Sequence, residues 1–192
     1  MIGYPFSEYE ALAEDVSQVI IPAPDIDKRV QEMGRAISAD YHGKRPLLVG
    51  VLKGVFIFIS DLLRAITIPA EVDFIDIASY SAESRDQGYV QFVKDLDISV
   101  LGRHVLFVED VVDTGLTLNY LLSNIRAREP ASLEVCALFV RDRLRLIDVP
   151  IKYKGFDLPD KFVVGYGLDH RELYRNLPGV GLLKAEVLTG NS

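Results

Sequence analysis

The feature that most constrains the fold is a strand, a tight turn and the start of a helix in one run, Val105 to Leu118 (VLFVEDVVDTGLTL). Val105 to Val108 is continuously apolar, which is typical of a parallel strand covered on both faces. Glu109 and Asp110 follow, where such a strand is expected to leave the sheet. This edge is the usual ligand crevice of open α/β folds. The run therefore predicts a strand–turn–helix unit with a binding site at the carboxyl end of its strand.

The same run predicts the chemistry of the ligand. Gly115 lets the backbone approach a ligand closely, and the helix-start N–H groups, with the hydroxyls of Thr114 and Thr117, can face an anion. An acidic pair after a strand is commonly only a solvated loop, and Asp or Thr at a helix start is commonly only a cap. The two features joined in one run arise by accident far less often. Carboxylates beside a phosphate-binding turn suit a ligand that carries sugar hydroxyls, a phosphate and magnesium. Phosphoribosyl pyrophosphate is such a ligand.

Composition and charge fit one soluble domain. The chain has 192 residues, and its 49% hydrophobic content supports a core without a disulfide, so the one cysteine, Cys136, is expected inside it. The N-terminal region is acidic rather than leader-like, and the apolar runs are too short to span a bilayer, which predicts a cytoplasmic protein that contacts no membrane. A net charge of −7 disfavours nucleic-acid binding. An anionic substrate would therefore need local cations, helix N-termini or metal ions.

Strand-like and helix-like segments alternate along the chain. We expect helices at 7–18, from Asp25 as N-cap to about 42, and at 55–66, with strands at 46–51, 71–78, 89–93, 105–108 and 133–140. Alternation of this kind predicts an α/β domain with a mostly parallel twisted sheet flanked by helices. Residues 79–88 are polar and are expected to form a mobile loop. We place a core at about 25–148, and a smaller subdomain at about 150–184 together with N-terminal residues.

Two further segments carry side chains that could bind a ligand. Lys53 and Gly54 directly follow the first strand, so they could offer a cation and backbone N–H groups at the same sheet edge, although an ordinary turn is an equal alternative. Phe162 begins an apolar run that could simply be core. Asp169 follows two glycines, and Arg175 is available for phosphate or for the surface. The three histidines show no spacing that indicates a metal site or a triad.

Five blocks of sequence stand in the order found in a known family: PLLVGVLKGVFIF, VDFIDIASYS, LGRHVLFVEDVVDTGLTL, GFDLPDKFVVGYGLD and YRNLP. From about Ile26 to Lys184 the chain resembles the hypoxanthine-guanine phosphoribosyltransferases, particularly the bacterial hypoxanthine enzymes. Two acids followed by D-T-G-x-T resemble the phosphoribosyl-pyrophosphate motif of all type I phosphoribosyltransferases. The block PDKFVVGYGLD is more specific, because it resembles the branch that acts on 6-oxopurines.

The resemblance implies a fold and a reaction. The fold would be that of a type I phosphoribosyltransferase, a single domain over 1–192 with a small hood subdomain and a mobile lid. The reaction would join hypoxanthine or guanine to phosphoribosyl pyrophosphate, giving IMP or GMP and pyrophosphate, in purine salvage. Mg²⁺ would be the cofactor, no nucleic acid would be a partner, and the assembly would be a homodimer or homotetramer.

The resemblance also implies a role for each matching residue. Asp113 would be the general acid/base at N7 of the purine, and Glu109 and Asp110 would hold the ribose hydroxyls directly or through magnesium. Asp169 would bind a second magnesium. The other implied contacts are Thr114, Gly115, Leu116 and Thr117 to the 5-phosphate; Lys53, Gly54 and Arg175 to pyrophosphate, with a cis peptide bond between Leu52 and Lys53; Phe162 and the Val163 main chain to the purine; and Ser79 and Tyr80 in the lid.

Two positions depart from the family pattern, and both bear on function. Arg141 stands where the family commonly has a lysine that donates to the purine 6-oxo group, so the preference among hypoxanthine, guanine and xanthine stays open. His170 replaces the aromatic residue that usually follows the metal-binding aspartate. A xanthine-preferring relative is one alternative. Another is a regulator that keeps the fold but binds RNA, as pyrimidine attenuation proteins do, although the acidic chain lacks the basic cluster that this would need.

Overall fold

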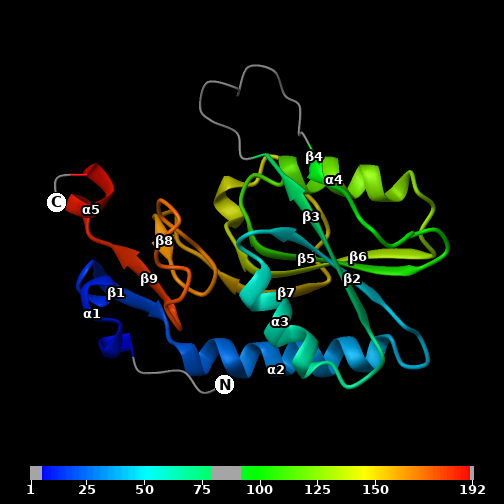
Figure 1. Cartoon of the computed structure of the whole chain (residues 1–192), viewed down its shortest axis with the longest axis horizontal. Helices are drawn as coiled ribbons and strands as arrows, with labels where there is room; N and C mark the ends of the chain where they lie inside the picture. The colour runs from blue at the N-terminus through cyan, green and yellow to red at the C-terminus, as the bar shows by residue number, and fades with distance from the viewer. Residues whose placement is uncertain (1–5, 79–91, 191–192) are drawn as a thin grey trace.

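The structure is a computed structural model that describes residues 6–78 and 92–190, and it contains two sheets flanked by helices (Figure 1). The larger sheet has the strand order β4-β3-β2-β5-β6-β7. All its neighbouring strands are parallel except β4 against β3, which confirms the expected mostly parallel α/β sheet. Its strands are β2 (Leu47–Leu52), β3 (Glu71–Ile77), β4 (Phe92–Lys94), β5 (His104–Val112), β6 (Ser132–Val140) and β7 (Tyr153–Asp157).

Helices cover both faces of the larger sheet, which explains its apolar strands. In Figure 1, α2 (Ala23–Asp40) and α3 (Phe56–Ala65) lie below the sheet and α4 (Leu116–Arg126) lies above it. Two separate apolar clusters form, one with the buried side chains of α2 and α3 and one with those of α4. Cys136 is buried in the first cluster, as expected, and burial raises the pKa of its thiol.

The strand order creates a crevice between β2 and β5. The chain runs from β2 through α3 to β3 in one direction across the sheet, and from β5 through α4 to β6 in the other. Adjacent strands whose connections diverge in this way form a topological switch point, where open α/β sheets bind ligands. β5 pairs with β2 only as far as Val108, opposite Gly50, whereas it pairs with β6 as far as Val112. Glu109 and Asp110 therefore stand where β5 parts from β2.

A smaller three-stranded antiparallel sheet lies at one end of the molecule. It has the order β1-β9-β8, with β1 (Val16–Ile21), β8 (Val163–Val164) and β9 (Val180–Leu183). In Figure 1 it stands on the left, beside the short helices η1 (Phe6–Tyr9), α1 (Glu10–Glu14) and α5 (Ala185–Thr189). Described residues from both ends of the sequence thus pack together into one unit beside the larger sheet.

Several expected boundaries are wrong, and each has a physical reason. The expected helix at 7–18 stops at Glu14, because the residues from Val16 pair with β9. Asp25 is not the N-cap of α2 but lies in its first turn. Pro22 is the N-cap, because Pro24 is compatible with the first helical turn, where its missing N–H would have no intrahelical acceptor. β7 pairs with β6 in the larger sheet, so the division expected near residue 150 is too early for this strand.

Part of the expected loop and strand cannot be compared with the structure. Ser79, Tyr80 and the rest of 79–91 lie outside the described residues, and β4 begins at Phe92. A short 3-10 helix, η3 (Asp142–Leu144), follows β6. Within 6–78 and 92–190, no helix has the length and apolarity needed to cross a membrane.

Candidate active site

The turns that follow β2 and β5 touch at the switch point. A Cβ atom built on Gly54 would overlap the carboxylate of Asp110, so only a glycine lets the two turns approach this closely. The peptide bond between Leu52 and Lys53 is cis, as the resemblance implied. Gly54 also meets the third element of the site, because a Cβ on Gly167 would overlap the carbonyl oxygen of Gly54. The three segments therefore enclose one region.

Glu109 and Asp110 point to opposite sides of β5, as successive strand residues do. Glu109 lines a cavity of about 260 Å³ together with the turn at Asp113–Thr117. Asp110 lines a second cavity, of about 310 Å³, with Lys53 and Gly54; its remaining walls are Val111, Arg141, Phe162, Val163, Leu168, Asp169 and Arg175. Val111 lines both, so the cavities are neighbours. Most of the site residues expected from sequence thus lie close together. Glu109 lines one of the two neighbouring cavities and Asp110 lines the other.

The two acids are buried without a cation that fully balances them. Burial, and then the charge of Asp110, raises the pKa of Glu109 well above its ordinary value. Burial also raises the pKa of Asp110, to about 6, although the Val111 N–H, which donates to its carboxylate at 2.8 Å, and the charge of Arg175 act in the other direction. Carboxylates whose pKa is raised because little positive charge surrounds them favour a ligand that supplies hydroxyl donors or a metal ion.

Removing the charge of Glu109 should stabilise the protein and impair ligand binding. Because the pKa of Glu109 is raised on folding, the folded state holds a proton that the unfolded chain releases above about pH 4.5, and the free energy of unfolding falls as the pH rises through that window. In urea unfolding at pH 8 without metal, Glu109→Gln should be about 1–2 kcal/mol more stable than the parent, with no advantage below pH 4.5. A variant less stable at pH 8 would contradict this description of the buried acid.

The turn that was expected to bind phosphate lies at the start of α4. Gly115, with φ of 79°, is the N-cap residue, and this left-handed conformation suits glycine. Leu116 begins the helix, and the turn from Asp113 to Thr117 lines the cavity of Glu109. A helix start carries N–H groups without intrahelical acceptors and a partial positive charge, so it favours an anion.

Asp113 forms an ion pair with Arg141, the residue that departs from the family pattern. Nη1 of Arg141 donates to both carboxylate oxygens of Asp113, at 3.2 and 3.3 Å, and Nη2 donates to the carbonyl oxygen of Lys161 at 3.1 Å. Arg141 was expected to face the 6-oxo group of a purine. The structure adds an ion pair with the expected general acid/base, so the guanidinium links the turn after β5 to the segment before β8.

Phe162 and Val163 lie as a stacking platform requires. Phe162 is 46% exposed and lines the cavity of Asp110, so it is not the core residue that its apolar run also allowed, whereas Val163 is buried. The ring of His170 meets the Phe162 ring edge-on, with centroids 5.4 Å apart. His170 therefore holds Phe162 in place, a role that sequence reasoning missed because the two residues are not at a spacing that indicates contact.

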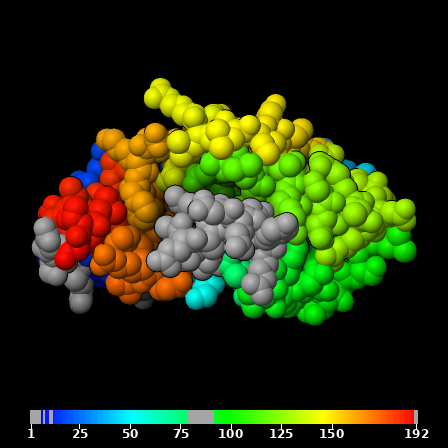
Figure 2. Space-filling view, turned by 90° about the horizontal axis from the view of Figure 1, so that it is seen from above, coloured from blue at the N-terminus to red at the C-terminus, as the bar shows by residue number. Residues whose placement is uncertain are grey.

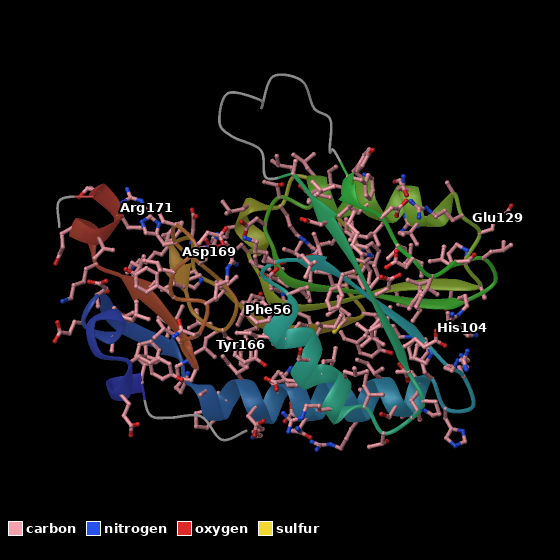
Figure 3. All side chains as sticks on the ribbon, in the orientation of Figure 1. Phe56, His104, Glu129, Tyr166, Asp169 and Arg171 are labelled. Atoms are coloured by element: carbon pink, nitrogen blue, oxygen red, sulfur yellow. The ribbon has the colours of Figure 1, made fainter. Side chains whose placement is uncertain are left out.

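The loop after β8 supplies the charged wall of the second cavity. Arg175 pairs with Asp169 at 2.9 Å and donates to the carbonyl oxygen of Gly167 at 2.8 Å. Glu172, which sequence reasoning did not single out, pairs with both Lys53 and Arg175. Figure 3 shows Asp169 on this loop, between the smaller sheet and the start of α3 at Phe56. In Figure 2 the orange loop stands on one side of the molecule and the green β5–α4 region on the other.

The carboxylates that line the two cavities suit a metal ion whose remaining ligands come from the substrate. Among the described residues, no three His, Cys, Asp or Glu side chains converge tightly enough to hold a metal by themselves. Asp110 and Asp169 nevertheless line the same cavity, and Glu109 lines the next. Mg²⁺ typically takes one or two carboxylates and completes its octahedron with water and substrate phosphates. The oxygen donors present fit that mode.

Comparison with known proteins gives three consistent matches. Residues 20–171 match the family model described as "Phosphoribosyl transferase domain". The hypoxanthine-guanine phosphoribosyltransferase of Streptococcus agalactiae is 43% identical over 176 residues, which is 92% of this chain and 98% of that protein. A crystal structure of a hypoxanthine phosphoribosyltransferase from Staphylococcus aureus has a TM-score of 0.88 and 41% identity, covering 93% of this chain and 97% of that chain.

A longer relative also matches. The bifunctional protein TilS/HprT of Listeria innocua is 42% identical over 178 residues, which is 93% of this chain. The matched region spans 28% of that protein. The same sequence block therefore occurs both as nearly a whole relative and as a part of a larger one.

Proposed function

The chain belongs to the phosphoribosyl transferase family, in its hypoxanthine-guanine phosphoribosyltransferase branch. We therefore propose that it catalyses a reaction of purine salvage. The reaction transfers the 5-phosphoribosyl group of phosphoribosyl pyrophosphate to N9 of hypoxanthine or guanine, giving IMP or GMP and pyrophosphate. The observation that carries the proposal is the pair of adjoining cavities at the β2–β5 switch point. One is walled by a helix start and Glu109, the other by cations, Asp110 and an exposed phenylalanine.

Each part of the substrates has a matching wall. The 5-phosphate binds the Thr114–Thr117 turn, where helix-start N–H groups and two hydroxyls face it. The ribose lies between Glu109 and Asp110, whose carboxylates accept hydrogen bonds from its hydroxyls. Pyrophosphate binds Lys53, Gly54 and Arg175; the purine stacks on Phe162, with the Val163 main chain at its edge. The lid would contain Ser79 and Tyr80, which lie outside the described residues.

The chemistry requires a stabilised leaving group and a dry site. As pyrophosphate leaves C1, the sugar becomes oxocarbenium-like, and Lys53 and Arg175 hold the charge that develops on the leaving oxygens. Asp113 exchanges a proton with N7 as N9 becomes the nucleophile. A closed site keeps water from the activated sugar. Magnesium would supply further charge neutralisation: Glu109 and Asp110 would hold the ribose hydroxyls directly or through one ion, and Asp169 would hold a second ion together with substrate oxygens.

Arg141 is suited to reading a 6-oxopurine. An arginine can donate a hydrogen bond to the O6 acceptor of such a base, and Arg141 stands on the wall of the cavity that contains Phe162. A 6-aminopurine presents a donor at that position instead, so it would leave the guanidinium unpaired. This supports the 6-oxopurine substrate class and leaves the order of hypoxanthine, guanine and xanthine to measurement.

We further propose that the protein acts in the cytoplasm as a homodimer or homotetramer. The proposal follows from the family to which the chain belongs, because the resemblance to that family implied this assembly. Sedimentation equilibrium at micromolar concentration would return a dimer or tetramer mass, and a monomer mass would contradict the proposal.

The assay that tests the function supplies labelled hypoxanthine, guanine or xanthine with phosphoribosyl pyrophosphate and Mg²⁺. Conversion of hypoxanthine or guanine to the nucleoside monophosphate is the expected result. Conversion of xanthine in preference to both would identify the xanthine-preferring alternative. Conversion of none, with tight RNA binding, would identify the regulator.

A further inference from the structure

The loop between β8 and β9 turns sharply at Arg171 and Glu172. His170 and Leu173 exchange backbone hydrogen bonds of 3.2 and 3.1 Å, and both central residues have positive φ, 51° and 66°. This is the pattern of a type I′ turn, which favours asparagine and glycine because a left-handed backbone is unfavourable for most side chains. The N–H of Glu172 donates to Asp169 at 3.0 Å. The turn thus carries a glutamate where its backbone conformation gives no reason for one.

The carboxylate of Glu172 lies between Lys53 and Arg175, the two cations proposed to bind pyrophosphate. Its Oε2 atom is 3.2 Å from Nζ of Lys53 and 3.3 Å from Nη2 of Arg175. Lys53 belongs to the turn after β2 and Arg175 to the loop after β8, so this one oxygen bridges two separate parts of the site. An anionic oxygen held by a lysine and an arginine is also what a bound phosphate would present. The hydrogen bond from Lys53, and then that from Arg175, lowers the pKa of Glu172.

The charge of this region is not balanced for an anionic ligand. Among the residues that the structure describes, three acids, Asp110, Asp169 and Glu172, lie beside two cations, Lys53 and Arg175, because Arg141 is paired with Asp113. Asp110 and Asp169 have a use as metal ligands. Glu172 has none in the proposed reaction, and its charge repels pyrophosphate from the position between the two cations.

We propose that Glu172 occupies the phosphate position between Lys53 and Arg175 in the ligand-free protein and, by competing for it, sets the affinity for pyrophosphate. The inference rests on the proposed function and adds to it a residue that determines how tightly the leaving group is held. Glu172 and Lys53 have side chains that are 64% and 67% exposed. Exposed ion pairs are weak, so a multiply charged ligand can displace the carboxylate, and its return favours release of the product.

The test is the binding of inorganic pyrophosphate, with Mg²⁺, to Glu172→Gln by isothermal titration calorimetry. The substitution keeps the shape of the side chain and removes its charge. We expect the dissociation constant for pyrophosphate to fall roughly tenfold, since one like charge is removed within contact distance of the ligand. IMP, which binds the other cavity and the base wall, should bind the variant and the parent equally.

Two further variants separate charge from backbone effects. Glu172→Asn removes the charge and suits the left-handed turn, so it should tighten pyrophosphate binding to a similar extent. Glu32→Gln removes a charge on α2, where Glu32 pairs with Arg29, and should leave the affinity unchanged. Unchanged or weaker pyrophosphate binding by Glu172→Gln, with normal IMP binding, would overturn this inference alone. If the parent binds neither ligand, the proposed function itself fails.

Discussion

Asp113→Asn should lower the turnover number by about 10²–10⁴-fold and leave the affinity for phosphoribosyl pyrophosphate within about threefold of the parent. The asparagine side chain has nearly the same shape and can still accept a hydrogen bond from Arg141, which now donates to both carboxylate oxygens. It cannot exchange a proton with N7 of the purine. Single-turnover rates and equilibrium titration with phosphoribosyl pyrophosphate would separate the two effects.

A matched control is Asp142→Asn. Asp142 lies one residue beyond Arg141 and pairs with Lys154 at 2.6 Å, but it lines neither cavity of the site. Its turnover number should stay close to that of the parent. Equal losses of turnover and of affinity in Asp113→Asn would show that Asp113 binds the substrate rather than transferring a proton.

Gly54→Ala should nearly abolish activity. The new methyl group would overlap the carboxylate of Asp110, so that carboxylate or one of the two turns must move. A displacement of about 1 Å in a substrate-positioning group can reduce the rate by about 100-fold, and we expect at least that loss in kcat/KM. The overlap should also lower the free energy of unfolding by about 1–3 kcal/mol. Steady-state kinetics and urea unfolding of the same preparation measure both effects.

Gly102→Ala provides the comparison for that experiment. Gly102 has φ of 66°, and no atom lies within 4 Å of a Cβ built there. The substitution should therefore cost some backbone stability, about 1 kcal/mol, without moving a group of the site. If Gly54→Ala were as active as Gly102→Ala, the close contact between the turns after β2 and β5 would have no role in catalysis.

Local patterns were sufficient to predict most of the larger sheet. The strands β2, β5 and β6 contain continuous apolar runs and β3 interleaves apolar with acidic residues, and these signals depend only on residues close together in sequence. The smaller sheet was harder, because the pairing of β1 with β9 joins residues far apart in the sequence, such as Val16 and Leu183. Nothing local to residues 16–18 distinguishes a strand from the end of a helix. Only the partner strand decides it.

The site also combines features that depend on neighbouring residues with features that depend on distant ones. The run from Glu109 to Thr117 is contiguous, so its chemistry could be predicted from spacing. The family resemblance, which the matches confirm, assigned expected roles to Lys53, Phe162 and Asp169, which the residues alone had only marked as candidates. The pairing of Arg141 with Asp113 and the position of Glu172 between two cations could not be predicted, because they depend on how three distant segments meet.

The most direct test of the central claim is a crystal structure of the protein with phosphoribosyl pyrophosphate and Mg²⁺. It should place the 5-phosphate on the N–H groups of the Thr114–Thr117 turn, the ribose hydroxyls at Glu109 and Asp110, and the pyrophosphate between Lys53 and Arg175. A ribose bound elsewhere, with neither acid within hydrogen-bond distance of its hydroxyls, would contradict the account.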